Sequence, residues 1–148
     1  MIKKVFLSIL IFGVLVTSVS FVQVETFTIT VNIKGFKNKQ GQIDLALYNN
    51  KNQYTDNPWK DFHVQKSTSK NGIITFILKD IVKGKYAITF LDDENSNKEM
   101  DYSFLGLPEE GFGFSNNVKP GFLSAPKYEK CTFDIYTDKE LTLNVQYW

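Results

Sequence analysis

Several residue types are scarce in this 148-residue chain, and each scarcity excludes a class of protein. The single cysteine, Cys131, rules out an internal disulfide, so stability must come from packing or from a bound metal. With only one histidine in the chain, a zinc site would lack the ligands that it needs. Seventeen basic residues stand against sixteen acidic ones, and this near balance excludes nucleic acids and charged membrane surfaces as expected partners.

The one long apolar run lies at the start of the chain. Lys3 and Lys4 precede an apolar stretch over residues 5–16, and small residues follow at 17–20. This order is typical of a signal peptide, which we expect to cover residues 1–20. A retained membrane anchor is the alternative, but a spanning helix needs about 20 apolar residues. No cysteine follows the run for lipid attachment, so we expect export to the periplasm or the medium rather than an integral membrane protein.

The remaining chain alternates between apolar and polar residues with a period of two, most clearly over residues 27–33, 43–47, 73–78 and 86–91. This period indicates half-buried strands, and no segment carries apolar residues at helical spacing over three turns. We expect one all-β domain over residues 26–148, an antiparallel β-sandwich of about seven strands. Its predicted type is immunoglobulin-like or transthyretin-like, with a small barrel as the alternative.

Turn residues predict how these strands connect. Residues 38–41 and the pair Asn71-Gly72 each predict a hairpin between the strands that flank them. Residues 128–136 and 141–147 are expected to form the last hairpin. Ahead of it, residues 93–127 hold three of the four prolines together with many large apolar residues. We therefore expect a long ordered loop, and loops of this length are commonly functional.

An acidic, amide-rich segment opens this long loop. Oxygen-bearing residues recur there at every second position: Asp93, Asn95, Asn97, Glu99 and Asp101. Such spacing is what Ca²⁺ requires from a loop that curls around it, so a calcium ion is a possible cofactor. The alternative is a turn in which the Asp and Asn side chains cap their own backbone.

The ligand frame of this calcium-binding-like loop is incomplete. In a twelve-residue loop of the EF-hand type that starts at Asp93, the sixth position is Lys98 where Gly is usual. The twelfth position is Phe104 where a Glu normally binds the ion. Glu109 or Glu110, brought back by the turn that contains Pro108, could supply the missing carboxylate. We expect weak affinity, of about 10⁻⁴ to 10⁻³ M.

Four segments of the chain resemble a known bacterial family: residues 41–48, residues 80–87, the acidic loop, and residues 104–117, which read FLGLPEEGFGFSNN. The chain is similar to the exported proteins grouped as domain of unknown function 2141, from about Thr28 to its end. The resemblance implies a signal peptide, a single β-sandwich domain and no established activity. The chain departs from the family at Leu91, where relatives often carry His, and at Lys98, where they tend to carry Gly.

The end of the family-like segment suggests a binding surface. Phe112 and Phe114 offer aromatic faces for sugar rings or an apolar partner, and Asn116 and Asn117 offer amides for hydroxyl groups. The alternative is structural: both Phe side chains plug an end of the sandwich, while their neighbouring glycines allow tight turns.

Catalysis finds little support in the sequence. On the expected strand, Cys131 lies on the same side as Phe133 and Ile135, so we expect it to be buried, whereas His63 is expected to face solvent. Glu109 and Glu110 are adjacent and point apart in an extended chain, unlike a glycosidase pair. We expect a non-enzymatic binding or structural module, with a carbohydrate- or cell-envelope-binding domain as the alternative. A hydrolase that uses the Asp/Glu cluster is the remaining enzyme class.

Overall fold

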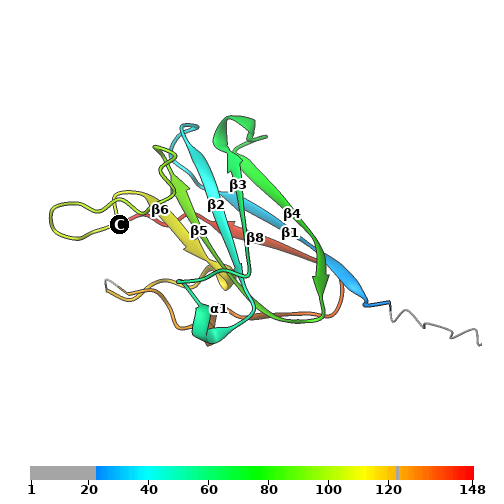
Figure 1. The fold of residues 1–148 in the computed structure, drawn as a ribbon. Coiled ribbons are helices and arrows are strands. Elements are labelled where there is room, and N and C mark those ends of the chain that lie inside the picture. Colours follow the sequence, from blue (N-terminus) through cyan, green and yellow to red (C-terminus); the bar gives the residue numbers. More distant parts are fainter. Residues whose placement is uncertain (1–22, 123) are drawn as a thin grey trace, which may run out of the picture.

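The computed structural model describes residues 23–122 and 124–148, and the predicted signal peptide lies outside them. The described chain is all-β, with two sheets around one apolar core (Figure 1). The strands are β1 (Thr26–Lys34), β2 (Gln42–Tyr48), β3 (Lys60–Gln65), β4 (Ile73–Val82), β5 (Gly84–Asp93), β6 (Gly111–Phe114), β7 (Phe133–Ile135) and β8 (Lys139–Asn144). The helical turns are η1 (Lys51–Gln53), η2 (Lys66–Thr68), η3 (Ser115–Asn117) and α1 (Tyr128–Cys131).

The smaller sheet has the order β4-β1-β8, and the larger one has the order β3-β2-β5-β6. β7 also pairs with β5, so β6 and β7 follow one another along the same edge of that strand. Both sheets contribute inward side chains to the core, which includes Ile29, Val31, Ile33, Leu45, Leu47, Phe76, Leu78, Tyr86, Ile88 and Phe90. The alternating segments of the sequence are therefore strands with one buried face, as predicted.

Two predicted hairpins are wrong. β1 pairs with β4 and β8 in the smaller sheet, while β2 pairs with β3 and β5 in the larger one. The turn at residues 38–41 thus carries the chain from one sheet to the other. Asn71 and Gly72 do form a tight turn, with φ angles of 52° and 74°. It joins β3 to β4, however, and these two strands belong to different sheets.

The last predicted hairpin is also wrong. Its first half contains the helical turn α1 before the short strand β7, which pairs with β5. Its second half is β8, which pairs with β1 in a parallel register, so the structure is not purely antiparallel. The long region before it is not a single loop, because β6 lies inside it and brings the described strands to eight.

The larger sheet uses both of its faces. Tyr86, Ile88 and Phe90 of β5 point into the core, while Ala87 on the opposite face joins a second apolar cluster. That cluster also contains Phe112, Phe114 and Cys131, with Tyr54, Met100, Val118 and Tyr128 packed against it. The outer face of this sheet is therefore partly covered by loops, and the candidate site lies there. Within the described residues, no helix is long and apolar enough to cross a membrane.

Candidate functional site

Asp93 ends β5 and anchors the acidic loop from the inside. Its side chain is fully buried, and its carboxylate accepts the backbone N–H of Lys98 at 2.9 Å and that of Asn97 at 3.2 Å. Burial raises the pKa of Asp93, but the Lys98 N–H, the neighbouring Asp44 and other backbone N–H groups outweigh burial. The pKa of Asp93 is therefore held below its usual range, and its carboxylate is ionised.

The remaining side chains of the loop satisfy one another. Asn95 Nδ2 donates to one oxygen of Asp101 at 2.6 Å, and Asn97 Nδ2 donates to the other at 3.3 Å. Asn97 Oδ1 also accepts the N–H of Glu99 at 2.8 Å. The structure thus brings Asp93, Asn95, Asn97 and Asp101 together, in a network of the kind that Asx turns make. Lys98, at the sixth position of the proposed frame, has a φ of 67° and adopts the left-handed conformation that Gly normally supplies there.

The carboxylate that returns to this loop belongs to Glu110 rather than Glu109. Glu109 is exposed, whereas Glu110 is buried and accepts the N–H of Glu94 at 2.8 Å and that of Asp101 at 3.3 Å. Burial raises the pKa of Glu110, partly offset by these two N–H groups. Among the described residues, no three His, Cys, Asp or Glu side chains form a metal-holding group. A cation in this loop would have to rely on amide and carbonyl oxygens as well.

A buried ion pair, which the sequence pattern did not indicate, lies beside the loop. Lys66 Nζ lies 2.5 Å from Asp92 Oδ1, and both side chains are 0% exposed. Tyr147 donates its hydroxyl hydrogen to the other oxygen of Asp92, and burial together with this bond raises the pKa of Tyr147. Asp92 points into the core because its parity on β5 is opposite to that of Asp93. In the sequence, the only indication of this ion pair is that two acidic residues, Asp92 and Asp93, are adjacent at the end of a strand. Nothing in the sequence identifies Lys66 as the partner of Asp92.

Phe112 and Phe114 lie on the outer face of the larger sheet and not at an end of the core. Phe112 pairs with Leu91 and Phe114 with Thr89, and the two rings meet edge to face with centroids 5.9 Å apart. Both side chains are largely buried, at 9% and 8% exposed. They form the floor of a groove of roughly 640 Å³, a volume typical of small-ligand sites.

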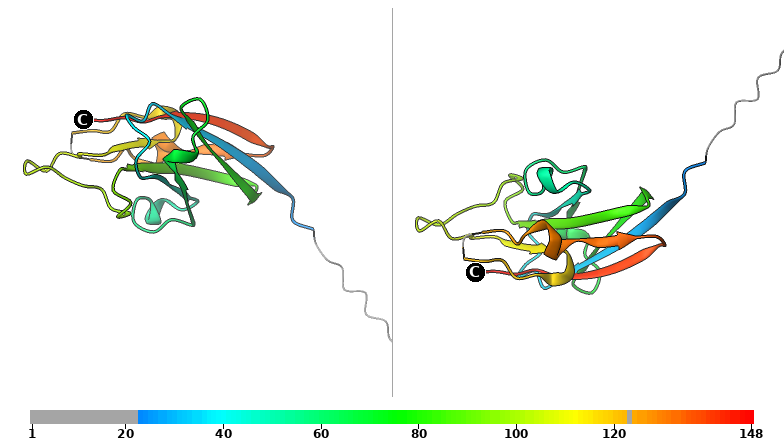
Figure 2. Two further views of the ribbon diagram at one scale, coloured as in Figure 1. Left: turned by 90° about the horizontal axis from the view of Figure 1, so that it is seen from above. Right: turned by 90° about the horizontal axis from the view of Figure 1, so that it is seen from below.

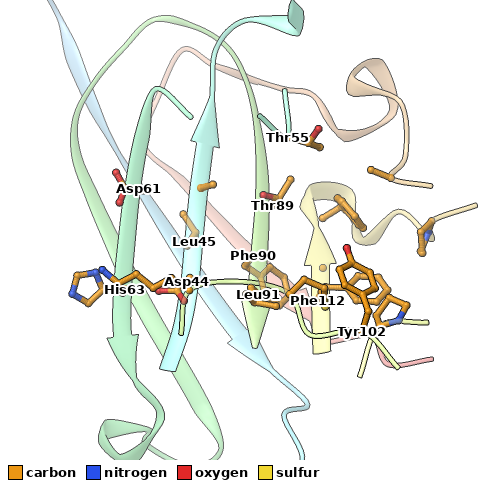
Figure 3. Close-up of a pocket in the computed structure, with 18 of the residues that line it drawn as sticks. Asp44, Leu45, Thr55, Asp61, His63, Thr89, Phe90, Leu91, Tyr102 and Phe112 are labelled. Carbon is orange, nitrogen blue, oxygen red and sulfur yellow. The ribbon is translucent and has the colours of Figure 1, made fainter. Parts of the chain in front are cut away.

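The groove combines an aromatic side with a polar side (Figure 3). Asp44 on β2 and Asp61 and His63 on β3 lie on one side, and Phe112 and Tyr102 lie on the other. The acidic loop and its continuation form one wall, with Lys98, Met100, Tyr102, Gly106 and Pro108. Pro120, Ser124, Ala125 and Trp148 form another. Neither Asp44 nor Asp61 was predicted as a site residue: Asp44 lies on the polar face of the predicted strand 43–47, and Asp61 lies in β3, just before the segment that alternates in the sequence.

Asp44 is the most perturbed acid in the groove. Burial, and then the nearby Asp93 carboxylate, raise the pKa of Asp44 to about 6, while the amide of Gln42 partly opposes them. Gln42 Nε2 lies 3.0 Å from Asp44 Oδ1 and 3.3 Å from Asp93 Oδ2, so one amide bridges the two acids. Because Asp93 is ionised, Asp44 holds its proton until the pH approaches 6. The polar side of the groove is therefore connected to the base of the acidic loop through Gln42.

Comparison with known families fits the resemblance noted in the sequence. The model of a bacterial family described as "Uncharacterized protein conserved in bacteria" (DUF2141) matches residues 31–144. The chain belongs to DUF2141. No curated protein and no solved structure matches it.

The family-like segment ends in Ser115, Asn116 and Asn117, and these side chains link β5, α1 and β8 through hydrogen bonds. Ser115 Oγ accepts the N–H of Ile88 at 2.9 Å. Asn116 Nδ2 donates to the carbonyl oxygens of Lys130 and Thr132, which flank Cys131 at the end of α1. Asn117 bonds to Thr142 and Asn144 of β8 in the other sheet. The amides of Asn116 and Asn117 therefore connect elements of the fold, while Phe112 and Phe114 line the groove.

His63 is exposed and Cys131 is buried, as predicted, but Cys131 lies at the end of α1 and not on a strand that faces the core. Cys131 is fully buried in the apolar cluster of the outer face, and burial raises the pKa of its thiol, which keeps it protonated. His63 is exposed on β3 opposite Asp44. His63 lines the groove from its outer edge, where its imidazole points away from Phe112 and Tyr102 (Figure 3), whereas Cys131 has a packing role.

Proposed function

We propose that this DUF2141 protein is a non-enzymatic binding module that captures a carbohydrate-like ligand in the groove on the outer face of its larger sheet. The observation that carries the proposal is the pairing of an aromatic floor and rim with polar groups across one concave site. Sugar rings present apolar faces together with hydroxyl groups, and such a site complements both. The two sheets around one core support a single β-sandwich of immunoglobulin-like or transthyretin-like type. The basic and apolar pattern of residues 1–20 supports the further proposal that the protein is exported after their removal.

Each side of the groove has a distinct role in this proposal. Tyr102 and Trp148 are 62% and 51% exposed, so their rings are free to stack on a sugar. Asp44, Asp61 and His63 would accept or donate hydrogen bonds to hydroxyl groups. The floor residues Phe112 and Phe114 would exclude water below the ligand.

Glycan-array screening and pull-down with peptidoglycan test this proposal, followed by calorimetry on the best ligand. We expect Tyr102→Ala and Asp61→Ala each to weaken binding at least tenfold, because each removes a direct contact. Tyr136→Ala is the matched control, since Tyr136 is 58% exposed but lies outside the groove. Uniformly negative screens, or equal losses for all three variants, would overturn the proposal.

We also propose that the acidic loop takes up Ca²⁺ weakly and thereby stiffens one wall of the groove. The alternating oxygens and the left-handed backbone at Lys98 support this second role. Calorimetric titration with Ca²⁺ tests it. Asp101→Ala should abolish the binding heat because it removes a carboxylate, whereas Glu99→Ala should retain it because position seven binds through its backbone carbonyl. Absence of binding heat in the wild type would overturn the proposal that the acidic loop binds Ca²⁺.

A further inference from the structure

A tight turn in the wall of the groove carries two large apolar residues at its tip. Gly106 N donates to the carbonyl oxygen of Ser103 at 2.8 Å and closes the turn. The two central residues, Phe104 and Leu105, are 103% and 75% exposed. Turn tips are ordinarily occupied by Gly, Asn, Asp, Ser or Pro, so a Phe-Leu pair there exposes apolar surface that the fold does not need.

A second turn repeats this arrangement. Gly121 and Ser124 bond to each other through both backbone N–H groups, at 3.1 and 3.4 Å. Phe122, between them, is 79% exposed, and its ring lies edge-on to that of Trp148 with centroids 6.2 Å apart. A large apolar side chain again lies next to a residue, Gly121, whose backbone is paired at the base of a turn.

Both turns lie at the same end of the molecule. All views in Figures 1 and 2 place them, together with the C-terminus, at the end opposite the first described residues of β1. They project as separate fingers and do not form a flat face. We define Phe104, Leu105 and Phe122 as the apolar tips.

We propose that the apolar tips insert into the interface of a zwitterionic lipid bilayer and hold the protein on a membrane surface. Projecting fingers suit a fluid layer better than a rigid protein partner, which would require a matching cavity for each finger. The hydrogen bonds at the base of each turn already pair backbone groups of Ser103, Gly106, Gly121 and Ser124, which lowers the cost of bringing these turns to a bilayer interface. Trp148 and Tyr102, behind the tips, are of the residue types that favour the headgroup level.

The charges behind the tips select the kind of lipid. Glu99, Asp101 and Glu109 outnumber Lys98 beside the first turn, whereas the exposed residues Lys119 and Lys127 flank the second. The charges behind the tips therefore nearly balance, and they lack the clustered Lys or Arg that attraction to an anionic membrane requires. The tips therefore suit a phosphatidylcholine-like surface, and their binding should not depend on anionic lipid.

Co-sedimentation of the purified protein with phosphatidylcholine vesicles tests the proposal. We expect the wild type to sediment with the vesicles, and the double variant Phe104→Ser/Leu105→Ser to lose at least tenfold in partitioning. Phe122→Ser should lose less, because it removes one apolar side chain instead of two. Ile77→Ser is the matched control and should bind like the wild type, since Ile77 is 60% exposed on the outer face of β4.

Three results would overturn the proposal: no sedimentation of the wild type, full binding by the double variant, or binding that appears only with phosphatidylglycerol. Self-association that the double variant loses, without vesicle binding, would also overturn it and would assign the tips to a second copy of the chain. All substituted side chains are exposed, so unchanged near-ultraviolet circular dichroism serves as the folding control. The groove variant Asp61→Ala should not alter vesicle binding, because Asp61 is not among the residues placed at the membrane, and this separates the proposal from the proposed function.

Discussion

Among individual residues, Lys66 and Asp92 make the most consequential contact, because both charges are fully buried. Removing one charge leaves the other unpaired in the core, and that is strongly unfavourable. We expect Lys66→Met to lower the free energy of unfolding by about 3–5 kcal/mol. The double variant Lys66→Met/Asp92→Leu should recover most of this loss, since it leaves no isolated buried charge.

Urea denaturation of the single and double variants provides the measurement. Lys51→Met is the control, because Lys51 and Glu129 form an ion pair of similar length whose side chains are 67% and 55% exposed. Exposed pairs contribute about 0–1 kcal/mol, so this variant should barely change the midpoint. Equal destabilisation by Lys66→Met and Lys51→Met would contradict the importance of burial.

Asp44 should make the stability of the protein depend on pH. Its pKa is raised to about 6 in the folded protein, against 3.8 for an ordinary Asp, so the folded chain binds a proton more tightly than the unfolded chain. Stability from this group therefore falls as the pH rises from about 4 to about 6, and is constant above. Asp93 acts in the opposite direction, because its pKa is lowered and its contribution is lost below about pH 4.

Asp44→Asn should remove this decline, because an amide does not titrate. Denaturation of both proteins at pH 4.5 and pH 7 provides the measurement. We expect the wild type to lose stability relative to the variant between these pH values. The loss should be well under the roughly 3 kcal/mol that the full pKa shift would give, since Asp44 is partly exposed. Parallel stability curves would show that burial and Asp93 do not act on Asp44 as described.

At the level of elements, the glycines of β6 allow close packing and do not form turns. Gly113 points toward the core, where an added Cβ would lie 2.2 Å from the Phe90 ring. We expect Gly113→Ala to destabilise the protein by about 1–3 kcal/mol through overpacking. Gly84 in β5 is the matched control, since its added Cβ would meet Tyr86 at an ordinary 3.4 Å.

Thermal melts of the two glycine variants check this prediction. Gly84→Ala should be neutral or slightly stabilising, because alanine restricts the unfolded chain. A melting temperature for Gly113→Ala equal to that of the wild type would mean that Phe90 moves aside without loss. That result would mean that close packing against Phe90 does not require glycine at position 113 of β6.

The sequence predicted strands well and their pairing poorly. Ile29, Val31 and Ile33 showed which face of β1 is buried, because alternation is a local property. Pairing depends on which sheet a connection enters, and neither residues 38–41 nor Asn71-Gly72 encodes that choice. β6 was missed because two of its four residues are Gly, which depresses a strand prediction.

The candidate site likewise has one part that the sequence indicates and one part that it does not. The acidic loop could be predicted because its oxygens repeat within nine residues. The groove could not, because Asp44, Asp61 and Phe112 come from three strands that are distant in the sequence. The roles of Asn116 and Asn117 were equally hidden, since their partners lie on α1 and β8. Local patterns thus indicate candidate ligands, while long-range pairing decides which of them share a site.

At the scale of the whole molecule, the acidic loop is linked to the fold without requiring an ion. Asp93 accepts N–H groups from the loop, and Glu110 accepts those of Glu94 and Asp101 from its other side. The core between the sheets contains neither group. We therefore expect the purified protein to remain folded in excess chelator, with unchanged near-ultraviolet circular dichroism and resistance to proteolysis. Collapse of either signal would show that the loop depends on metal.

Calcium should add only a modest increment to this metal-free stability. With a dissociation constant of about 10⁻⁴ to 10⁻³ M, 10 mM Ca²⁺ stabilises the folded state by roughly 1.4–2.7 kcal/mol. For a domain of this size, that raises the melting temperature by about 3–10 °C, which scanning calorimetry measures directly. Mg²⁺ at the same concentration should give a smaller shift, because it keeps its own waters and requires stricter geometry. Equal shifts for both ions would indicate general screening of Asp93, Glu99 and Asp101 in place of coordination in the loop.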